Sequence, residues 1–444
     1  MKNKQQWMLS ALAVGLALAC SASAATLDEA VAMALENSPT LQAAESRIES
    51  AQAMLRQAKS YYYPSIGLAA NYSVSDNPAQ AFMMTLNQGK LNMMAPGFNP
   101  NEADDTDNFR GSLTAQWRLF DLQRDAGRRM AQYGTELSAE AFAAARNQLV
   151  YEITQGFYGV LQAQAFAKVQ EEAVASIEES LRIAKERFEA GGAVKTDVLN
   201  LETQLAQANE DLIKARNGAQ LALAALNAAI GDDFITAENI VAPDPAVLSN
   251  PPPVCKDPEG FLKRPEMRAA TLLRRIKEHD VRKARGGYAP TISAFGSVDA
   301  DSGNARDFEQ SYVAGVMAEI NIFDGVRTRA AVQAAQADWK AAQADENKAR
   351  LNLRLDLRQA FLRSQETWER LEVTRKSLET AEEARRIVQE QYEQGAADIA
   401  ILLQTQVGVT AMQTRHAAAQ YDFLTALANL QRAKGEFGEV AGNP

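Results

Sequence analysis

The sequence predicts a mainly α-helical protein with a small β part, in which long antiparallel helical hairpins accompany four short strands. Three observations support this prediction. The chain repeats itself, it contains two very long stretches without proline, and four short segments alternate apolar and polar residues. Together they predict a coiled-coil helical barrel joined to a sheet that several chains complete.

Residues 1–24 have the form of a secretory leader. Lys2 and Lys4 precede an apolar run too short to span a bilayer, and Ala22-Ser23-Ala24 is a small-x-small cleavage site. Export from the cytoplasm is therefore predicted. Lipidation of Cys20 stays open as an alternative, although the leucine before it is one place out of register.

The chain is internally duplicated, because residues 38–68 align without a gap with residues 264–294. Each copy reads helix, strand, loop, strand, very long helix, sharp turn, helix. The loop at 76–108 is longer than its counterpart at 301–310. Corresponding positions include Pro39 and Pro265, Pro64 and Pro290, Asp121 and Asp324, Gly191 and Gly395, and Gly231 and Gly435.

The duplication predicts a division of the chain. It comprises a signal peptide (1–24), a first repeat (25–231), a proline-rich connector at the equator of the helical region (232–263), a second repeat (264–437) and a short C-terminal tail (438–444).

Proline is absent from 101 to 242 and from 291 to 443, which permits long helices. The helix after the first turn has a heptad seam, and a similar seam follows the second turn. The seam residues are Val198, Leu201, Leu205, Ala208, Leu212, Ala215, Ala219, Ala222, Leu226 and Ala229, then Leu402, Val409, Met412, Ala419, Phe423, Ala426 and Leu430. His416 falls on the second seam, as a hydrogen-bonded interior histidine or, alternatively, a pH sensor.

Four segments alternate with a period of two, namely 65–75, 112–119, 291–299 and 313–322. In the first, Ile66 and Leu68 lie on one face and Ser65 and Gly67 on the other. This is the strand pattern of an outer-membrane barrel, with about ten residues per crossing. A soluble sheet packed on one face shows the same alternation, but export, duplication and the long helices favour the membrane interpretation.

Four strands cannot close a barrel, which needs about eight, and an open edge in lipid leaves backbone groups unpaired. Several chains must therefore contribute strands. Two chains give an interior filled by side chains, whereas three give a 12-stranded barrel with a passage.

The composition excludes several classes of function. The formal net charge is −10 before removal of the leader, which argues against nucleic-acid binding. With Cys255 as the one cysteine after the leader, no internal disulfide is expected. Only two histidines are present, which makes a histidine metal site or a hydrolase site a poor interpretation. No enzyme activity and no cofactor are predicted.

Three kinds of motif carry a family resemblance. They are the opening "LDEAVAMALENSPTLQAAESRIESAQAMLRQAKSYYYPSIGL", the strand-to-helix turns "WRLFD" and "INIFD", and the tip sequence "RFEAGGAVKTDVLNLETQLAQANEDL". Together they resemble the TolC family of outer-membrane channel-tunnel proteins across residues 26–437. The resemblance implies a homotrimer with a 12-stranded transmembrane β-barrel in the outer membrane of a Gram-negative bacterium and a helical tunnel in the periplasm.

The resemblance also implies export of small molecules or polypeptides, in a tripartite efflux or type I secretion system. The partners would be a periplasmic adaptor, an inner-membrane transporter of RND, ABC or MFS type, and outer-membrane lipid. A soluble periplasmic coiled-coil adaptor is the alternative. The adaptor-docking tips would be Gly191, Gly192, Ala193, Thr196, Asp197, Gly395, Ala396 and Ala397, supported by Phe188 and Tyr392. Asp197 would also suit a helix cap.

The second tip departs from the family pattern. Relatives carry an aspartate ring and an arginine–tyrosine latch there, whereas this chain has Ile401 and Gln404 at the aspartate positions and Ala397 at the arginine position. Closure is therefore expected to use apolar constriction near Ile401, with Asp398 as a weaker charge ring.

The long loop contains Met83, Met84, Met93 and Met94. Thioethers suit Cu(I), so a copper site is one hypothesis, and packing of the loop over a barrel mouth is the plainer one. Unchanged copper tolerance after replacement of all four by leucine would exclude the metal site.

Overall fold

The structure, a computed structural model, describes residues 25–102, 104–233, 235–253 and 259–437. The predicted leader, Cys20, Cys255 and the C-terminal tail lie outside the described residues. The chain divides into two compact units. A sheet unit comprises Thr40–Ala145 and Pro258–Asp356, and a hairpin unit comprises the remaining segments. Each unit takes segments from both predicted repeats.

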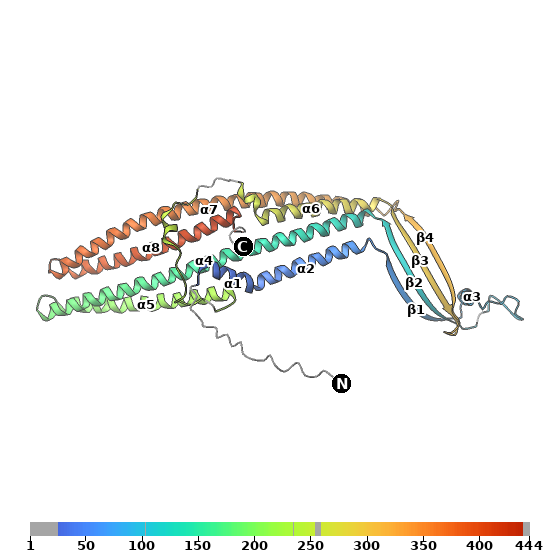
Figure 1. Ribbon diagram of the computed structural model, residues 1–444, viewed down its shortest axis with the longest axis horizontal. Coiled ribbons are helices and arrows are strands. Elements are labelled where there is room, and N and C mark those ends of the chain that lie inside the picture. The colour runs from blue at the N-terminus through green and yellow to red at the C-terminus, as the bar shows by residue number, and fades with distance from the viewer. Residues whose placement is uncertain (1–24, 103, 234, 254–258, 438–444) are drawn as a thin grey trace, which may run out of the picture. The chain divides into compact units, whose positions relative to one another are not determined.

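The sheet unit contains one four-stranded antiparallel sheet and the helices that enter and leave it (Figure 1). The strands are β1 (Ser65–Ser75), β2 (Thr106–Phe120), β3 (Thr291–Ser302) and β4 (Glu309–Glu319). The helices are α2 (Pro39–Ser60), α3 (Pro78–Asn87), α6 (Pro265–Arg285), the 3-10 turns η2 (Gly260–Lys263) and η3 (Gly286–Tyr288), and the first parts of α4 (Leu122–Glu189) and α7 (Arg327–Glu393).

The hairpin unit is helical. Its helices are α1 (Leu27–Asn37), the rest of α4, α5 (Lys195–Ile230), the 3-10 turn η1 (Pro245–Ser249), the rest of α7, and α8 (Ile399–Lys434). The corresponding glycines Gly231 and Gly435 end α5 and α8 with φ of 84° and 78°, a left-handed conformation that glycine adopts without steric cost. The predicted mainly α fold with a small β part is confirmed.

The strand register confirms the predicted faces. Ile66 pairs with Ala115 and Leu68 with Leu113, so apolar residues share one face, while Ser65 pairs with Gln116 on the other. Leu68 is 82% exposed, as expected for a face that meets lipid and not a protein core.

The boundaries of three strands and one loop were predicted wrongly. β2 begins at Thr106, well before the expected 112, β3 continues to Ser302 beyond the expected 299, and β4 spans Glu309–Glu319 instead of 313–322. The expected loop at 76–108 contains α3, whose start is capped by Asn77 with Pro78 in the first turn. Pairing on both sides extends β2, since Phe109 lies opposite Ser302 of β3 and Thr106 lies opposite Ser75 of β1.

The core of the hairpin unit lies where α1 packs against α4, α5 and α8. Phe157, Ile153, Leu226 and Ile230 are almost fully buried there. The predicted seams are confirmed, with Leu201, Leu402 and Phe423 fully inside, except at Ala229, which is exposed while its neighbour Ile230 is buried. Over many turns a 3.5-residue pattern drifts against a 3.6-residue helix, which shifts the buried position by one.

None of the helices in the described ranges combines the length and the apolar character that crossing a membrane requires.

Candidate functional site

Two helical hairpin turns, one in each repeat, form the candidate site in the hairpin unit. In the first turn Gly191 has a φ of 76°, and in the second Gly395 has a φ of 78°. The amide of Gly192 donates to the carbonyl of Arg187 (2.7 Å), and that of Gly395 donates to the carbonyl of Tyr392 (3.0 Å). The paired glycines thus serve one backbone purpose, which is to reverse the chain in a tight left-handed turn.

Most of the predicted tip residues are accessible. Gly191, Gly192, Thr196, Gly395 and Ala396 are exposed, and Ala193, Asp197 and Ala397 are half-buried. Phe188 is 43% exposed, whereas its counterpart Tyr392 is only 3% exposed. The small side chains leave the backbone of both turns open to a partner, but the docking role itself stays a prediction.

The capping role expected for Asp197 is wrong. Helix α5 has Val194 at its N-cap, without a side-chain hydrogen bond, and Asp197 lies within the first turn. The carboxylate there still favours the helix through the positive N-terminal dipole. In the second hairpin the cap is Asp398, whose carboxylate accepts from the amide of Ala400 at 3.2 Å.

Arg187 joins the two hairpins, and sequence reasoning missed it. Its Nη1 donates to the carbonyl of Tyr392 (2.5 Å), its Nη2 donates to the carbonyl of Gly192 (3.3 Å), and its guanidinium lies 5.0 Å from the centre of the Tyr392 ring. The second hairpin has Ala397 where the family resemblance implies an arginine, and the arginine that contacts Tyr392 here comes from the first hairpin. The only signal was an arginine beside Phe188, and nothing in the sequence pairs it with Tyr392.

Tyr392 lies inside an apolar cluster that holds the tips together. Ala184, Leu201 and Leu402 surround it, each almost completely buried. Burial raises the pKa of Tyr392, with Arg187 acting in the opposite direction, so the phenol is neutral at physiological pH. Its hydroxyl is buried without a hydrogen-bond partner within the described residues, an unfavourable arrangement that the cation–π contact partly offsets.

The three predicted constriction residues follow one another at steps of three, from Asp398 at the N-cap of α8 to Ile401 and Gln404 in its first turns. Asp398 and Gln404 are exposed and Ile401 is 51% exposed, so all three are available on the surface of a single chain. Residues three apart lie on one side of a helix. Their gathering around a pore stays a prediction.

A cavity of about 740 Å³ in the hairpin unit is lined by residues of α4, α5, α7 and α8. Gln406 reaches into this region and donates to the hydroxyls of Ser180 (2.8 Å) and Ser176 (3.2 Å). Its amide oxygen is buried without a partner among the described residues. The hairpins therefore meet across a small polar layer that is less tightly packed than the seams.

His416 lies at a hydrogen-bonded interior position, as predicted. Its Nδ1 lies 3.3 Å from the hydroxyl of Thr374, and its Nε2 lies 3.1 Å from the amide nitrogen of Gln420. Burial lowers the pKa of His416 below 6.5, and Arg375 acts in the same direction.

Because folded His416 binds a proton less tightly than the unfolded chain does, the stability of α8 should fall as pH drops below about 6.5. Hydrogen exchange of the α8 amides across this range measures the effect. His416→Gln, which keeps polar partners and cannot titrate, should flatten the profile. An unchanged pH dependence in the variant would contradict the assignment.

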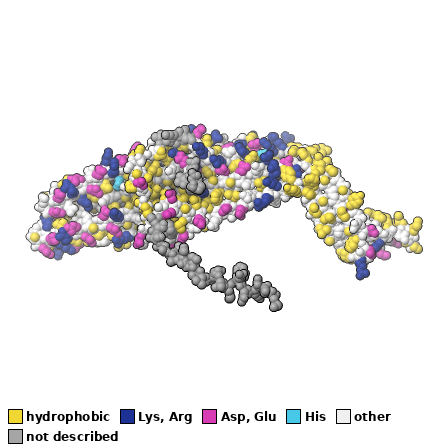
Figure 2. All heavy atoms as spheres, in the orientation of Figure 1, with side chains coloured by type: hydrophobic (Ala, Val, Ile, Leu, Met, Phe, Trp, Pro, Cys, Tyr) yellow, Lys and Arg dark blue, Asp and Glu magenta, His cyan; other side chains and the backbone are white. Residues whose placement is uncertain are grey.

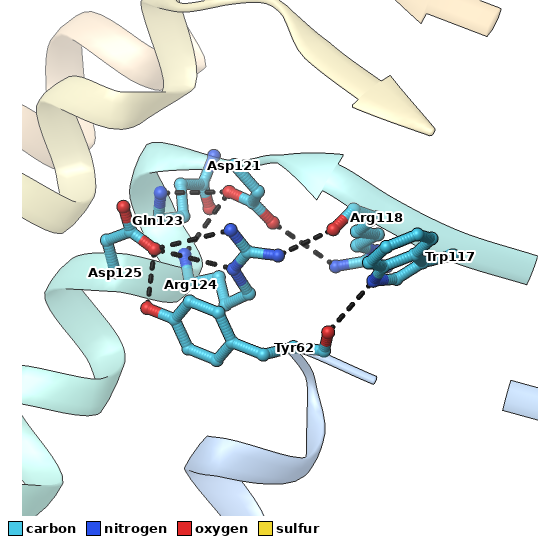
Figure 3. A network of polar contacts seen from close by, with 7 residues as sticks. All are labelled: Tyr62, Trp117, Arg118, Asp121, Gln123, Arg124 and Asp125. Atoms are coloured by element: carbon cyan, nitrogen blue, oxygen red, sulfur yellow. Dashed lines mark hydrogen bonds and ion pairs between the residues drawn. The ribbon is translucent and has the colours of Figure 1, made fainter. Parts of the chain in front are cut away.

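The strand-to-helix turn "WRLFD" forms a second polar network, in the sheet unit (Figure 3). Asp121 is buried and accepts from the amides of Gln123 (2.8 Å) and Arg124 (3.2 Å), which fixes the start of α4. The indole of Trp117 donates to the carbonyl of Tyr62 (2.8 Å), tying β2 to the segment before β1. The motif thus supplies acceptors for two amides of the first turn of α4 directly after the strand ends.

A third polar cluster lies where α3 folds back onto the sheet. Gln88 is buried and donates to Asn108 (3.1 Å), and Asn108 donates to the carboxylate of Asp301 (2.7 Å). Arg110 forms an ion pair with the same carboxylate at 3.4 Å. The cluster fastens the long loop to β2 and β3.

The loop methionines differ widely in exposure. Met84 is half-buried, Met83 is 51% exposed, and Met93 and Met94 are 70% and 95% exposed. The copper hypothesis stays a prediction.

A sheet with an exposed apolar face, joined to long helical hairpins, defines a class of outer-membrane channel-forming proteins. The chain belongs to the outer membrane efflux protein family, whose model matches residues 30–232 and 261–436. That family consists of channel proteins. The alternative of a soluble periplasmic adaptor is therefore wrong.

Two curated relatives cover nearly the whole chain. Protein CyaE of Bordetella pertussis is 26% identical over 94% of this chain and 85% of its own length. The alkaline protease secretion protein AprF of Pseudomonas aeruginosa is 24% identical over 99% of this chain and 90% of its own length.

Solved structures share the fold. The outer membrane protein VceC of Vibrio cholerae superposes with a TM-score of 0.79 at 18% identity, covering 92% of this chain and 96% of that one. The open-state MtrE outer membrane channel of Neisseria gonorrhoeae gives 0.76 at 19% identity, covering 92% and 88%. The chain is an outer-membrane export channel of a Gram-negative bacterium, with four strands contributed to a β-barrel and a helical tunnel in the periplasm.

Proposed function

We propose that the channel is a homotrimer that exports a polypeptide, in company with a periplasmic adaptor and an inner-membrane transporter. The sheet supports the trimer. In the described chain β1 pairs only with β2, and β4 only with β3, so both edges are open. Open edges are not tolerated in lipid, and three copies joined edge to edge supply a 12-stranded barrel with a passage.

Cross-linking of the two edges tests the assembly. Cysteines placed at Ala70 in β1 and Ala314 in β4, in a chain with Cys255 replaced by serine, should yield a covalent species of about three chains with a short bifunctional reagent. The same cysteines placed singly should give no such species. A ladder that ends at two chains would contradict the trimer.

The alkaline protease secretion protein among the relatives supports a polypeptide cargo. The inner-membrane partner is a transporter of RND, ABC or MFS type. The exposed tip residues, Gly191, Thr196 and Gly395 among them, are the surface proposed to meet the adaptor. The channel itself needs no catalytic site and no cofactor, which is in keeping with a family of channels.

Deletion of the gene for this channel in the native host should abolish secretion of a specific protein, which proteomics of the culture medium measures. An unchanged set of secreted proteins would contradict a polypeptide cargo.

The constriction of the closed channel is proposed to form at Ile401. Ile401→Asp should raise single-channel conductance and antibiotic leakage, because a carboxylate hydrates a passage that an apolar ring keeps dry. Ile213→Asp is the control, since Ile213 is 69% exposed on α5, outside the predicted constriction. If Ile401→Asp and Ile401→Ala both leave conductance unchanged, the constriction lies elsewhere.

A further inference from the structure

A cavity rich in positive charge lies in the sheet unit, where β2 becomes α4. Its volume is about 790 Å³, within the range of small-molecule sites. Five cationic side chains and one histidine line it, against the single carboxylate of Asp125. They are Lys59, Arg124, Arg128, Arg129, Arg282 and His279. A chain that is acidic overall thus concentrates cations at one place.

The cavity adjoins the apolar face of the sheet. Figure 2 shows hydrophobic side chains covering the visible face of the strands, with Lys and Arg side chains gathered over the adjoining helix ends. Tyr62 lines the cavity, and its carbonyl accepts from the indole of Trp117, a residue of the apolar face. Tyr63, another lining residue, is 72% exposed. Such aromatic residues mark the boundary between hydrocarbon and water.

The charge in the cavity is only partly compensated. Arg124 is held in place, with its guanidinium 4.0 Å from the centre of the Tyr62 ring and its Nη1 donating to the carbonyl of Arg118 at 2.6 Å. Asp125 accepts from the hydroxyl of Tyr62 at 2.5 Å and lies 3.4 Å from Arg124.

Arg282 pairs with Glu278 of the same helix at 2.8 Å, but three of the remaining cations lack such a partner. Across the described ranges, Lys59, Arg128 and Arg129 form no ion pair with a carboxylate. Burial lowers the pKa of His279, and the charges of Arg282 and Arg129 lower it further, which agrees with a positive potential here.

We propose that this cavity binds the head group of an anionic glycerophospholipid from the periplasmic leaflet of the outer membrane. Guanidinium groups recognise phosphate oxygens through paired, charge-assisted hydrogen bonds, so Arg128 and Arg129 hold the phosphate. The acyl chains extend from the cavity along the apolar face of the strands. The lipid fixes the depth of the channel in the membrane and neutralises the cationic side chains of the cavity, which would otherwise repel one another.

Native mass spectrometry of the purified full-length protein in mild detergent tests the proposal, with phosphatidylglycerol and phosphatidylcholine as probes. The protein should retain phosphatidylglycerol in preference to phosphatidylcholine. Arg128→Gln with Arg129→Gln should weaken retention by roughly 10- to 30-fold, given the contribution of each basic residue to anionic-lipid binding. Thermal unfolding of the variant, compared with the parent, establishes that the fold is intact.

The matched control is Arg327→Gln with Arg329→Gln, which removes the same charge from exposed positions at the start of α7, outside the cavity. This variant should retain phosphatidylglycerol as the parent does. Equal losses in the two variants, or no loss in the first, would overturn the proposal. Displacement of the lipid by an equal concentration of inorganic phosphate would show a site for free phosphate instead, and would also overturn it.

Discussion

Replacing Arg187 with alanine should open the channel at its tips and make cells leak. The substitution removes the hydrogen bonds to the carbonyls of Tyr392 and Gly192 and the cation–π contact with the Tyr392 ring. Loss of such bonds at a half-buried position costs about 1–3 kcal/mol, and each 1.4 kcal/mol shifts an equilibrium about tenfold. Since the contact joins the two hairpins, the closed arrangement should lose about that much relative to an open one. Single-channel conductance and uptake of a large antibiotic measure the effect.

Arg182→Ala is the matched control. Arg182 lies little more than one turn before Arg187 on α4, but its ion pairs are with Glu179 and Glu186 of the same helix. It is 55% exposed and connects nothing across the hairpins, so its removal should leave conductance unchanged. Arg187→Lys should restore closure only in part, because lysine cannot reach two carbonyls with a planar fork. A parent-like conductance for Arg187→Ala would show that the contact is structural and has no part in gating.

Replacing Asp301 with alanine should release the long loop from the sheet. Asp301 is 1% exposed, accepts from Asn108 and pairs with Arg110. Its loss leaves the Asn108 amide without this acceptor and Arg110 with only the longer ion pair to Asp299 (3.9 Å). The expected cost is about 2 kcal/mol, which should raise local opening of α3 by roughly 10- to 30-fold. Limited proteolysis between 76 and 105 measures this opening.

Asp307→Ala provides the comparison for the loop. Asp307 is an exposed aspartate near Asp301 in sequence, and among the described residues the side chain that donates to its carboxylate is Asn304 of the same turn. Proteolysis of this variant should match the parent. If Asp301→Ala is cleaved no faster than Asp307→Ala, the loop is held by contacts other than the Gln88–Asn108–Asp301 cluster.

The features predicted well from the sequence are those that recur with a fixed period along the backbone. The alternation of Ile66 and Leu68 with Ser65 and Gly67 assigned both faces of β1, because successive side chains of a strand point to opposite sides. The seam through Leu201 and Leu402 was assigned for the same reason, since helical geometry fixes which residues share a face. It failed at Ala229, where the small difference between heptad and helical period had accumulated.

Boundaries and caps were less well predicted. β2 begins at Thr106 because β1 offers partners that far, with Ser75 opposite Thr106, and no property of residues 106–111 alone indicates this. Aspartate is a common N-cap residue, but Asp197 does not lie at the N-cap, because the backbone of the turn places Val194 at the start of α5. In both cases a neighbouring segment decided between local alternatives that the sequence left equal.

By itself the sequence determined the duplicated plan of the chain, the two faces of its strands, its long helices and the glycine turns that reverse them. Each of these follows from periods and backbone preferences that act within a few residues. Only the tertiary structure decided that Arg187 meets Tyr392, 205 positions away, that Gln88 fastens the loop, and that five cations from three segments line one cavity. Such contacts depend on how packed elements bring distant side chains together, and no local pattern encodes the distance between them.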